Sequence, residues 1–200
     1  AMGPVGVIID EADAAVGDRS SSGDSGTSSR VFAKLASTMG DTANRGHILW
    51  FLLTCRPDLL PVDLKRQGRA EVHIPLFYPH SEEERLEMFR VMSKKTKTSF
   101  SKDALSASVG TYELSGADIE AVVVRSKRLA YLDGRKRVKA KDLEAVLESF
   151  VPAIRGEEIE LQELAAVIEC SDTAFLTEKY CKAERRVLHQ RLNELKIVID

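Results

Sequence analysis

The sequence has little of several features that would place it in a familiar class of protein. Its 200 residues hold no apolar run near the ~18 residues that span a bilayer, and no signal segment is visible. The three cysteines, Cys55, Cys170 and Cys181, lack zinc-site spacing and are odd in number, which predicts reduced thiols in a cytoplasmic protein. None of the four histidines precedes a glutamate, which excludes an HExxH zinc site. The net charge of −2 gives no global attraction to nucleic acid or anionic lipid.

What is present begins with a strand pattern that ends in two acids. Val5–Ile9 is apolar and rich in β-branched residues, as buried parallel strands are, and Asp10 and Glu11 follow it directly. The carboxyl ends of strands in open α/β sheets are where ligands bind, so these acids would face a ligand. The first carboxylate can hold Mg²⁺, usually through water, and the second can polarise an attacking water. Strands that end in two solvated acids are common, so this pattern decides nothing by itself.

Two further patterns follow in a fixed order. A second apolar run, Ile48–Leu53, leads into the segment Thr54 to Asp58 and then into Arg66-Gln67-Gly68-Arg69. Farther along lies Ser115-Gly116-Ala117-Asp118. In AAA-family ATPases these patterns have counterparts in the same order. The strand with its two acids resembles the Walker B motif, and the segment from Thr54 to Arg69 resembles the second region of homology. The Gly-Ala-Asp run resembles the start of the helix that meets the adenine side of the nucleotide. The resemblance covers residues 4–153.

This resemblance implies a role for each matching residue. Asp10 would support Mg²⁺, and Glu11 would be the general base for the attacking water. Arg66 and Arg69 match the arginines that reach into the neighbouring subunit's site as fingers, where a guanidinium neutralises charge on the transferred phosphoryl group. Gly116 and Ala117 would lie close to the base or ribose of the nucleotide. ATP and Mg²⁺ are the implied cofactors, and the implied partners are further copies in a hexameric ring and a protein substrate.

The chain departs from the family pattern at two places. No glycine is followed by lysine anywhere, so the phosphate-cradling Walker A loop is absent, and the glycines of the polar run 17–26 do not replace it. In the family that loop precedes the Walker B strand. Cys55 stands where the family usually has an asparagine that orients the attacking water, and a thiol is a poor substitute for an amide donor.

These departures leave two hypotheses of function open. The first is an ATPase that hydrolyses ATP in a ring and remodels or unfolds a protein substrate. The alternative is a non-catalytic assembly module that has no nucleotide site of its own and contributes arginine fingers and lid contacts. Cys55 and the absent Walker A loop favour the alternative, whereas the intact spacing of Arg66 and Arg69 is compatible with both.

The predicted fold class is α/β, a partial parallel P-loop-NTPase sheet followed by an all-α lid and a helical extension. The expected domains are 1–79, 80–153 and 154–200, and the polar run 17–26 is expected to be a mobile loop. Periodicity, caps and prolines predict a strand over 72–74, a helix that begins after Ser81, and helices over 29–39, 102–109, 116–132, 140–149, 157–170 and 173–196.

Two further patterns can be explained by structure alone, without a functional role. Eight basic residues lie between Arg125 and Lys141, as a solvated helix end often has, and a nucleic-acid patch is the less favoured hypothesis. The leucines from Leu188 to Leu195 favour a packed hairpin face over an oligomer seam, because they span too few heptads for a coiled coil. Nucleic acid and membrane are therefore not expected as partners of this segment.

Overall fold

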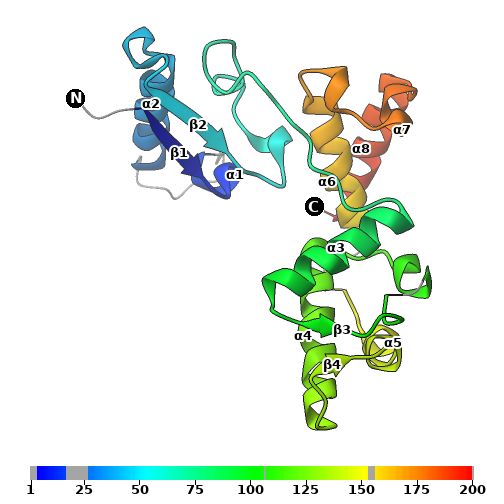
Figure 1. Cartoon of the computed structure of the whole chain (residues 1–200). Coiled ribbons are helices and arrows are strands. Elements are labelled where there is room, and N and C mark those ends of the chain that lie inside the picture. Colours follow the sequence, from blue (N-terminus) through cyan, green and yellow to red (C-terminus); the bar gives the residue numbers. More distant parts are fainter. Residues whose placement is uncertain (1–3, 17–26, 106, 153–155, 200) are drawn as a thin grey trace. The chain divides into compact units, whose positions relative to one another are not determined.

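The structure divides into two compact units. The computed structural model, shown in Figure 1, describes residues 4–16, 27–105, 107–152 and 156–199, so the predicted loop over 17–26 lies outside the described residues. The first unit combines the chain up to Leu76 with the chain from Gly156, and the second runs from Phe77 to Arg155. The mixed α/β fold class is confirmed, with short parallel-strand sheets followed by helices. None of the described helices is long and apolar enough to cross a membrane. The three-domain division stays a prediction.

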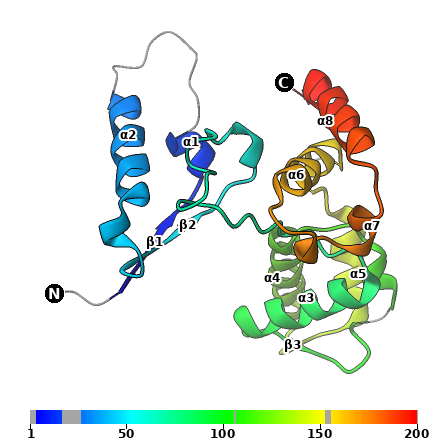
Figure 2. The same ribbon diagram turned by 90° about the horizontal axis from the view of Figure 1, so that it is seen from above.

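A pair of parallel strands organises the first part of the chain. Strand β1 (Val5–Ile9) runs beside β2 (Ile48–Leu52), with Val5 opposite Ile48 and Ile9 opposite Leu52. Figures 1 and 2 show the short helix α1 (Ala12–Val16) at the ends of both arrows. The longer helix α2 (Thr27–Gly40) spans the helix predicted over 29–39. A 3₁₀ turn, η1 (Thr42–Asn44), capped by the Asp41 side chain, leads into β2.

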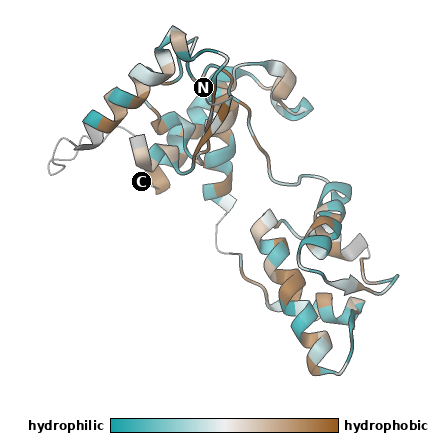
Figure 3. Cartoon of the chain, turned by 60° about the vertical axis from the view of Figure 1, so that its left-hand side comes forward, coloured by the Kyte–Doolittle hydropathy of each residue, from teal (hydrophilic) through white to brown (hydrophobic). Residues whose placement is uncertain are grey.

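Only one face of this sheet is covered within the described part of the chain. Ile9, Trp50 and Leu52 face the helices and pack against a buried cluster made of Ala12, Ala36, Met39, Leu60 and Leu64. On the opposite face Ile8 is 68% exposed and Leu49 is 62% exposed. The strands beside the N-terminus accordingly carry the hydrophobic colour in Figure 3. The sequence predicted strands buried on both faces. In the described structure this prediction holds for one face of the sheet only.

The segment after β2 is irregular apart from the 3₁₀ turn η2 (Pro57–Leu59). The strand predicted over 72–74 is wrong, because no ladder forms there. The His73 backbone bonds instead to Ser171: the His73 N–H donates to Ser171 Oγ over 2.9 Å, and the Ser171 N–H donates to the His73 carbonyl over 3.4 Å.

The C-terminal helices complete the first unit. Helix α6 (Gly156–Glu169) confirms the helix predicted over 157–170, and it packs against α8 (Arg185–Ile199). The single helix predicted over 173–196 is wrong, since this stretch is divided into η4 (Thr173–Phe175), α7 (Glu178–Cys181) and α8. The Asp172 side chain accepts from the Ala174 N–H over 2.9 Å, which caps η4 and starts the break.

The second unit is a small helical domain with a two-residue parallel strand pair. Its helices are α3 (Glu82–Lys95), α4 (Gly116–Leu132) and α5 (Ala140–Ser149), and β3 (Ser99–Phe100) pairs with β4 (Arg137–Val138). The helix predicted over 102–109 is wrong, because the described part holds turns and a short 3₁₀ helix, η3 (Ala107–Thr111). Side chains from all three helices form the core, including Phe89, Ile119, Val122, Val123 and Leu143.

Candidate functional site

The two predicted catalytic acids stand at the carboxyl end of β1. Asp10 follows the last strand residue, and Glu11 adopts a left-handed backbone conformation with φ of +49°, which is uncommon outside glycine. The Glu11 N–H donates to Asp10 Oδ1 over 2.9 Å, so the turn is closed by the first acid itself. Both residues are exposed. The strained turn therefore presents two carboxyl groups at the edge of the sheet, as the strand pattern predicted.

A hydrogen-bonded pair that the sequence did not reveal joins the ends of β1 and β2. Thr54 Oγ1 donates to Asp13 Oδ1 over 2.5 Å, and the same hydroxyl accepts from the Arg56 N–H over 3.0 Å. The backbones meet at the same point, since the Leu53 N–H donates to the Ile9 carbonyl over 2.9 Å. Asp13 is thus a positioning residue for the edge. The sequence shows an acid three positions after Asp10. It does not show that Thr54 is the partner of this acid, because that contact depends on the pairing of β1 with β2.

Cys55 lies next to this pair at the same edge. It directly follows Thr54, it is exposed, and its thiol is free. The neighbouring Thr54 hydroxyl donates its hydrogen to Asp13, and a carboxylate only accepts, so neither side chain supplies the amide-type donor that Cys55 lacks. The role of Cys55 in water orientation stays a prediction.

The carboxyl groups present suit Mg²⁺ that arrives with a nucleotide. Within the described residues no group of three or more His, Cys, Asp or Glu side chains is arranged to hold a metal ion. Mg²⁺ is usually bound through one or two carboxylates together with substrate phosphates and waters, so a complete protein cage is not required. Asp10, exposed at the strand end, is the residue that would support the ion.

The two predicted finger arginines differ in how firmly their side chains are held. The Arg66 side chain is 68% exposed, and it forms an ion pair with Asp63 over 3.0 Å, also at the surface. The Arg69 guanidinium donates to the Asp63 carbonyl over 2.5 Å and lies against Gly40, where an added Cβ would approach Arg69 Nε to 3.1 Å. Arg66 is therefore available to a partner, whereas Arg69 is held against its own unit.

The turn between these arginines depends on Gly68. Its φ is +82°, and an added Cβ would come within 2.8 Å of the Arg45 guanidinium. Its N–H donates to the Glu71 carboxylate over 2.6 Å. A side chain at this position would strain the backbone and displace Arg45.

Asp58 ties the beginning of the arginine segment to two cations. Its carboxylate, 9% exposed, pairs with Arg56 over 3.1 Å and with Lys196 of α8 over 2.6 Å. Burial opposes ionisation, but the hydrogen bonds from Arg56 and Lys196 outweigh it and lower the pKa of Asp58 below its ordinary value. The segment that carries Arg66 is thus anchored by an ionised carboxylate, which the sequence did not reveal.

Gly116 and Ala117 begin helix α4 in the second unit. The Ser115 hydroxyl accepts from the Asp118 N–H over 3.0 Å, and the Ser115 N–H donates to the Asp118 carboxylate over 3.1 Å, which forms a capping box. A Cβ added at Gly116 would meet Met92 Cε at 3.7 Å, an ordinary contact. Packing inside the unit therefore does not require glycine here, and the predicted contact of Gly116 and Ala117 with a nucleotide is untested.

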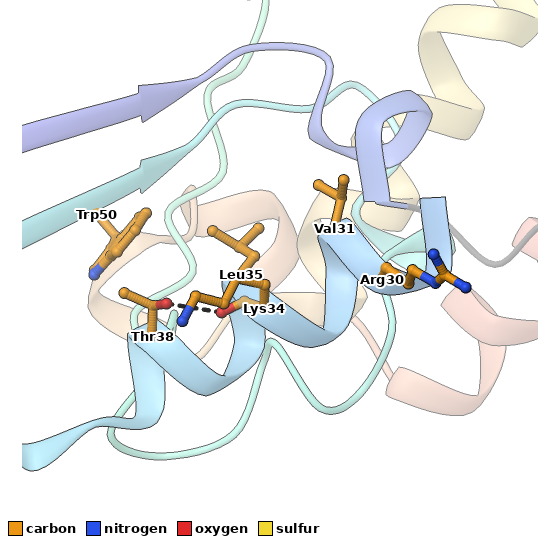
Figure 4. A pocket seen from close by; sticks show the side chains of 6 residues that line it. All are labelled: Arg30, Val31, Lys34, Leu35, Thr38 and Trp50. Carbon is orange, nitrogen blue, oxygen red and sulfur yellow. Dashed lines mark hydrogen bonds between the residues drawn. The ribbon is translucent and has the colours of Figure 1, made fainter. Parts of the chain in front are cut away.

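The described surface also has an apolar depression, shown in Figure 4. Its walls come from α2 and from Trp50 of β2, and the lining residues are Arg30, Val31, Lys34, Leu35, Thr38 and Trp50. None of the residues at the carboxyl edge lines it. We assign it no part in the chemistry.

The basic cluster between Arg125 and Lys141 is partly neutralised inside the second unit. Arg135 pairs with Asp142 over 2.7 Å and with Asp133 over 2.8 Å. Lys127 donates to the Thr96 carbonyl over 2.8 Å. These internal contacts favour the structural interpretation of the cluster over a nucleic-acid patch.

The chain is similar to known ATPases. The model of the ATPase family associated with various cellular activities (AAA) matches residues 2–78. Proteasome-activating nucleotidase 1 of Halobacterium salinarum is 31% identical over 147 residues, which cover 72% of this chain and 36% of that protein. The Cell division cycle protein 48 homolog of Archaeoglobus fulgidus is 27% identical over 177 residues, or 81% of this chain and 24% of that protein.

A third relative comes from a eukaryote. The Vesicular-fusion protein SEC18 of Saccharomyces cerevisiae is 33% identical over 129 residues, which are 62% of this chain and 17% of that protein. The chain thus spans between 17% and 36% of the length of these three relatives. With the paired acids, the neighbouring strand end and the two arginines in the expected order, and with the family model matched over the strands that carry them, this chain belongs to the AAA family of ATPases.

Proposed function

We propose that this chain is the water-activating and finger-bearing part of an ATPase that works as a ring. The observation that carries the proposal is the shared carboxyl edge of β1 and β2: Asp10 and Glu11 follow β1 directly, and Thr54, just after β2, bonds to Asp13. Glu11 accepts a proton from the attacking water, and Asp10 supports Mg²⁺. When bound, Mg²⁺ would neutralise charge on the phosphates of ATP. The Asp13–Thr54 hydrogen bond keeps the two strand ends in register during the reaction.

In the proposed ring of six copies, Arg66 completes the site of a neighbouring copy. Its exposure supports this role, because a finger has to leave its own surface to reach another subunit's phosphates. Arg69, held by Asp63 and Gly40, shapes the segment that presents Arg66. We further propose a protein substrate, since the relatives include a proteasome-activating nucleotidase and a vesicular-fusion protein.

A non-catalytic assembly module is the second candidate. Cys55 favours it, because the exposed thiol stands at the edge where an amide donor would orient water. Such a module would use Arg66 to stimulate a neighbour without turning over ATP itself.

Complementation between two inactive variants separates these candidates. In the full-length protein, Glu11→Gln removes the base and Arg66→Ala removes the finger, and we expect losses of ~10²–10⁴-fold and ~10³–10⁵-fold in kcat. Mixing the two variants should restore part of the ATPase activity, because an Arg66→Ala copy keeps its base and receives the finger of a Glu11→Gln neighbour.

The control for this experiment is Arg128→Ala, which removes an exposed arginine of the second unit. It should leave the ATPase activity unchanged. Absence of recovery in the mixture would exclude a finger supplied in trans. Full activity of Glu11→Gln alone would exclude the assigned base. A full-length wild type that hydrolyses no ATP would favour the assembly module.

A further inference from the structure

The segment that carries Arg66 is held at its beginning by the C-terminal helices. Lys196 of α8 donates to Asp58 over 2.6 Å, and Lys65 pairs with Glu169, the last residue of α6, over 2.9 Å. Both ion pairs are mostly shielded, with Asp58 9% exposed and Lys65 13% exposed. Lys65 also donates to the Pro57 carbonyl over 3.2 Å, which links the two anchors.

The far end of the segment is held by the loop that follows α6. The ring of His73 has one nitrogen 2.6 Å from the Glu169 carbonyl and the other 2.8 Å from the Ala70 carbonyl. The His73 N–H donates to Ser171 Oγ over 2.9 Å. The chain from Asp58 to His73 is therefore fastened to α6, α8 and their connection on both sides of the arginines.

Between these anchors the segment has little regular structure of its own. The Ala70 N–H donates to the Leu64 carbonyl over 3.0 Å and closes a loop that contains Arg66 and Arg69, while the Leu64 side chain is fully buried. No sheet ladder holds this described stretch. Its conformation therefore depends on side-chain anchors rather than on a repeating backbone pattern.

We infer that helices α6 and α8 act as a clamp that positions the Arg66 loop, with Asp58, Lys196 and Glu169 as positioning residues. The inference rests on the proposed function, because a finger that is misplaced by about 1 Å can lose a large part of its effect on rate. It gives the C-terminal helices a role in turnover through the loop that they hold. Loosening the clamp should reduce kcat and leave KM nearly unchanged, because a finger acts on charge that develops in the transition state.

Hydrogen exchange on the 200-residue chain tests the clamp without any nucleotide. In Lys196→Met we expect the Ala70 amide and its neighbours over 59–73 to exchange on the order of tenfold faster, whereas the amides of β1, β2 and α4 keep their rates. Lys196→Arg, which retains the cation, should restore the wild-type rates. Unchanged exchange of the Ala70 amide in Lys196→Met would overturn the inference.

If Lys196→Met unfolds the whole unit, swapping the charges of the Lys65–Glu169 ion pair provides a second test. Glu169→Lys should loosen the Arg66 loop, and the double variant Lys65→Glu with Glu169→Lys should tighten it again. Equal exchange rates in the single and double variants would overturn the clamp, because a general packing defect would not be repaired by a second charge change.

Kinetics of the full-length protein then connect the clamp to turnover. We expect kcat of Lys196→Met to fall at least tenfold with KM unchanged, and Lys196→Arg to recover it. A normal kcat despite fast exchange of the Ala70 amide would overturn the catalytic role of the clamp. An inactive wild type with a clamp that responds to Lys196→Met would contradict the proposed ATPase and leave the mechanical part of the inference standing.

Discussion

At the residue scale, the atoms at the ends of β1 and β2 decide what the edge can do to water. In the proposed reaction Glu11 is the base. The Thr54 hydroxyl donates to Asp13, and the next residue, Cys55, offers an exposed thiol and no amide donor. One preorganised donor at a reacting oxygen is typically worth ~10²–10³-fold in rate. The rate of the full-length protein should therefore be sensitive to this one side chain.

We expect Cys55→Asn to raise kcat for ATP hydrolysis on the order of 10²-fold, because the amide can orient the attacking water where the thiol cannot. Steady-state ATPase assays of the full-length protein measure the change. Cys181→Asn, which alters another exposed thiol, is the matched control and should have no effect. A fall in kcat for Cys55→Asn would show that the thiol itself serves the reaction.

The second residue-scale prediction concerns Asp58. Asp58→Asn should lower the free energy of unfolding of the first unit by about 1–3 kcal/mol, because it removes a charged acceptor from Arg56 and Lys196. Since the folded state lowers the pKa of Asp58, its stabilisation is complete above the unfolded-state pKa of ~3.9 and is lost as the pH falls through the folded-state pKa.

Urea unfolding between pH 3 and pH 7 checks both parts of this prediction. The stability difference between wild type and Asp58→Asn should shrink as the pH drops below about 4. Glu178→Gln is the control, because Glu178 belongs to the same unit, is 82% exposed and pairs with Lys182 at the surface, where ion pairs contribute ~0–1 kcal/mol. A difference that stays constant down to pH 3 would contradict the role of the Asp58 charge.

At the scale of elements, predictions from local sequence signals were confirmed more often than predictions that depend on long-range pairing. The helices that begin after Ser81 and at Gly116 were predicted from capping residues, and the structure shows a capping box at each. The strand predicted over 72–74 failed because a strand needs a partner, and His73 bonds to Ser171 from far along the sequence. Asp13 and Asp58 were missed for the same reason, since their partners are distant in sequence.

The cap of α4 gives a prediction at this scale. Ser115→Ala should destabilise the second unit by about 1 kcal/mol, because the Asp118 N–H loses its acceptor. Thermal unfolding should shift by ~4–8 °C for a unit of this size. Ser149→Ala at the end of α5 is the control, since its hydroxyl bonds only to carbonyls of its own helix and should change stability by less than ~0.5 kcal/mol. Equal shifts would argue against the cap.

At the scale of the whole molecule, the two units differ in how completely they bury apolar surface. The second unit encloses a core with Phe89 and Ile119 almost inaccessible, whereas one face of the β1–β2 sheet leaves Ile8 and Leu49 more than half exposed. An exposed apolar sheet with open edges is prone to pair with other chains. Burial also provides most of the stabilisation of a fold, so the units should differ in stability.

We expect the 200-residue chain to unfold in two thermal transitions, the first in the β1–β2 region and the second in the second unit. A fragment of residues 77–155 should fold alone and unfold at the temperature of the upper transition. Calorimetry combined with hydrogen exchange of β2 and α4 assigns the transitions. The reverse order, with α4 exchanging before β2, would contradict the argument from burial.

The sequence by itself determined the family, the two acids at a strand end, the arginine pair and the helices with caps, because each depends on residues close together in the chain. Only the tertiary structure decided that Thr54 binds Asp13, that Arg66 is largely exposed while Arg69 is held against its own unit, and that α6 and α8 fasten the arginine segment. The bonds Thr54–Asp13 and Lys196–Asp58 join residues far apart in sequence, and their geometry follows from packing, which no local pattern encodes.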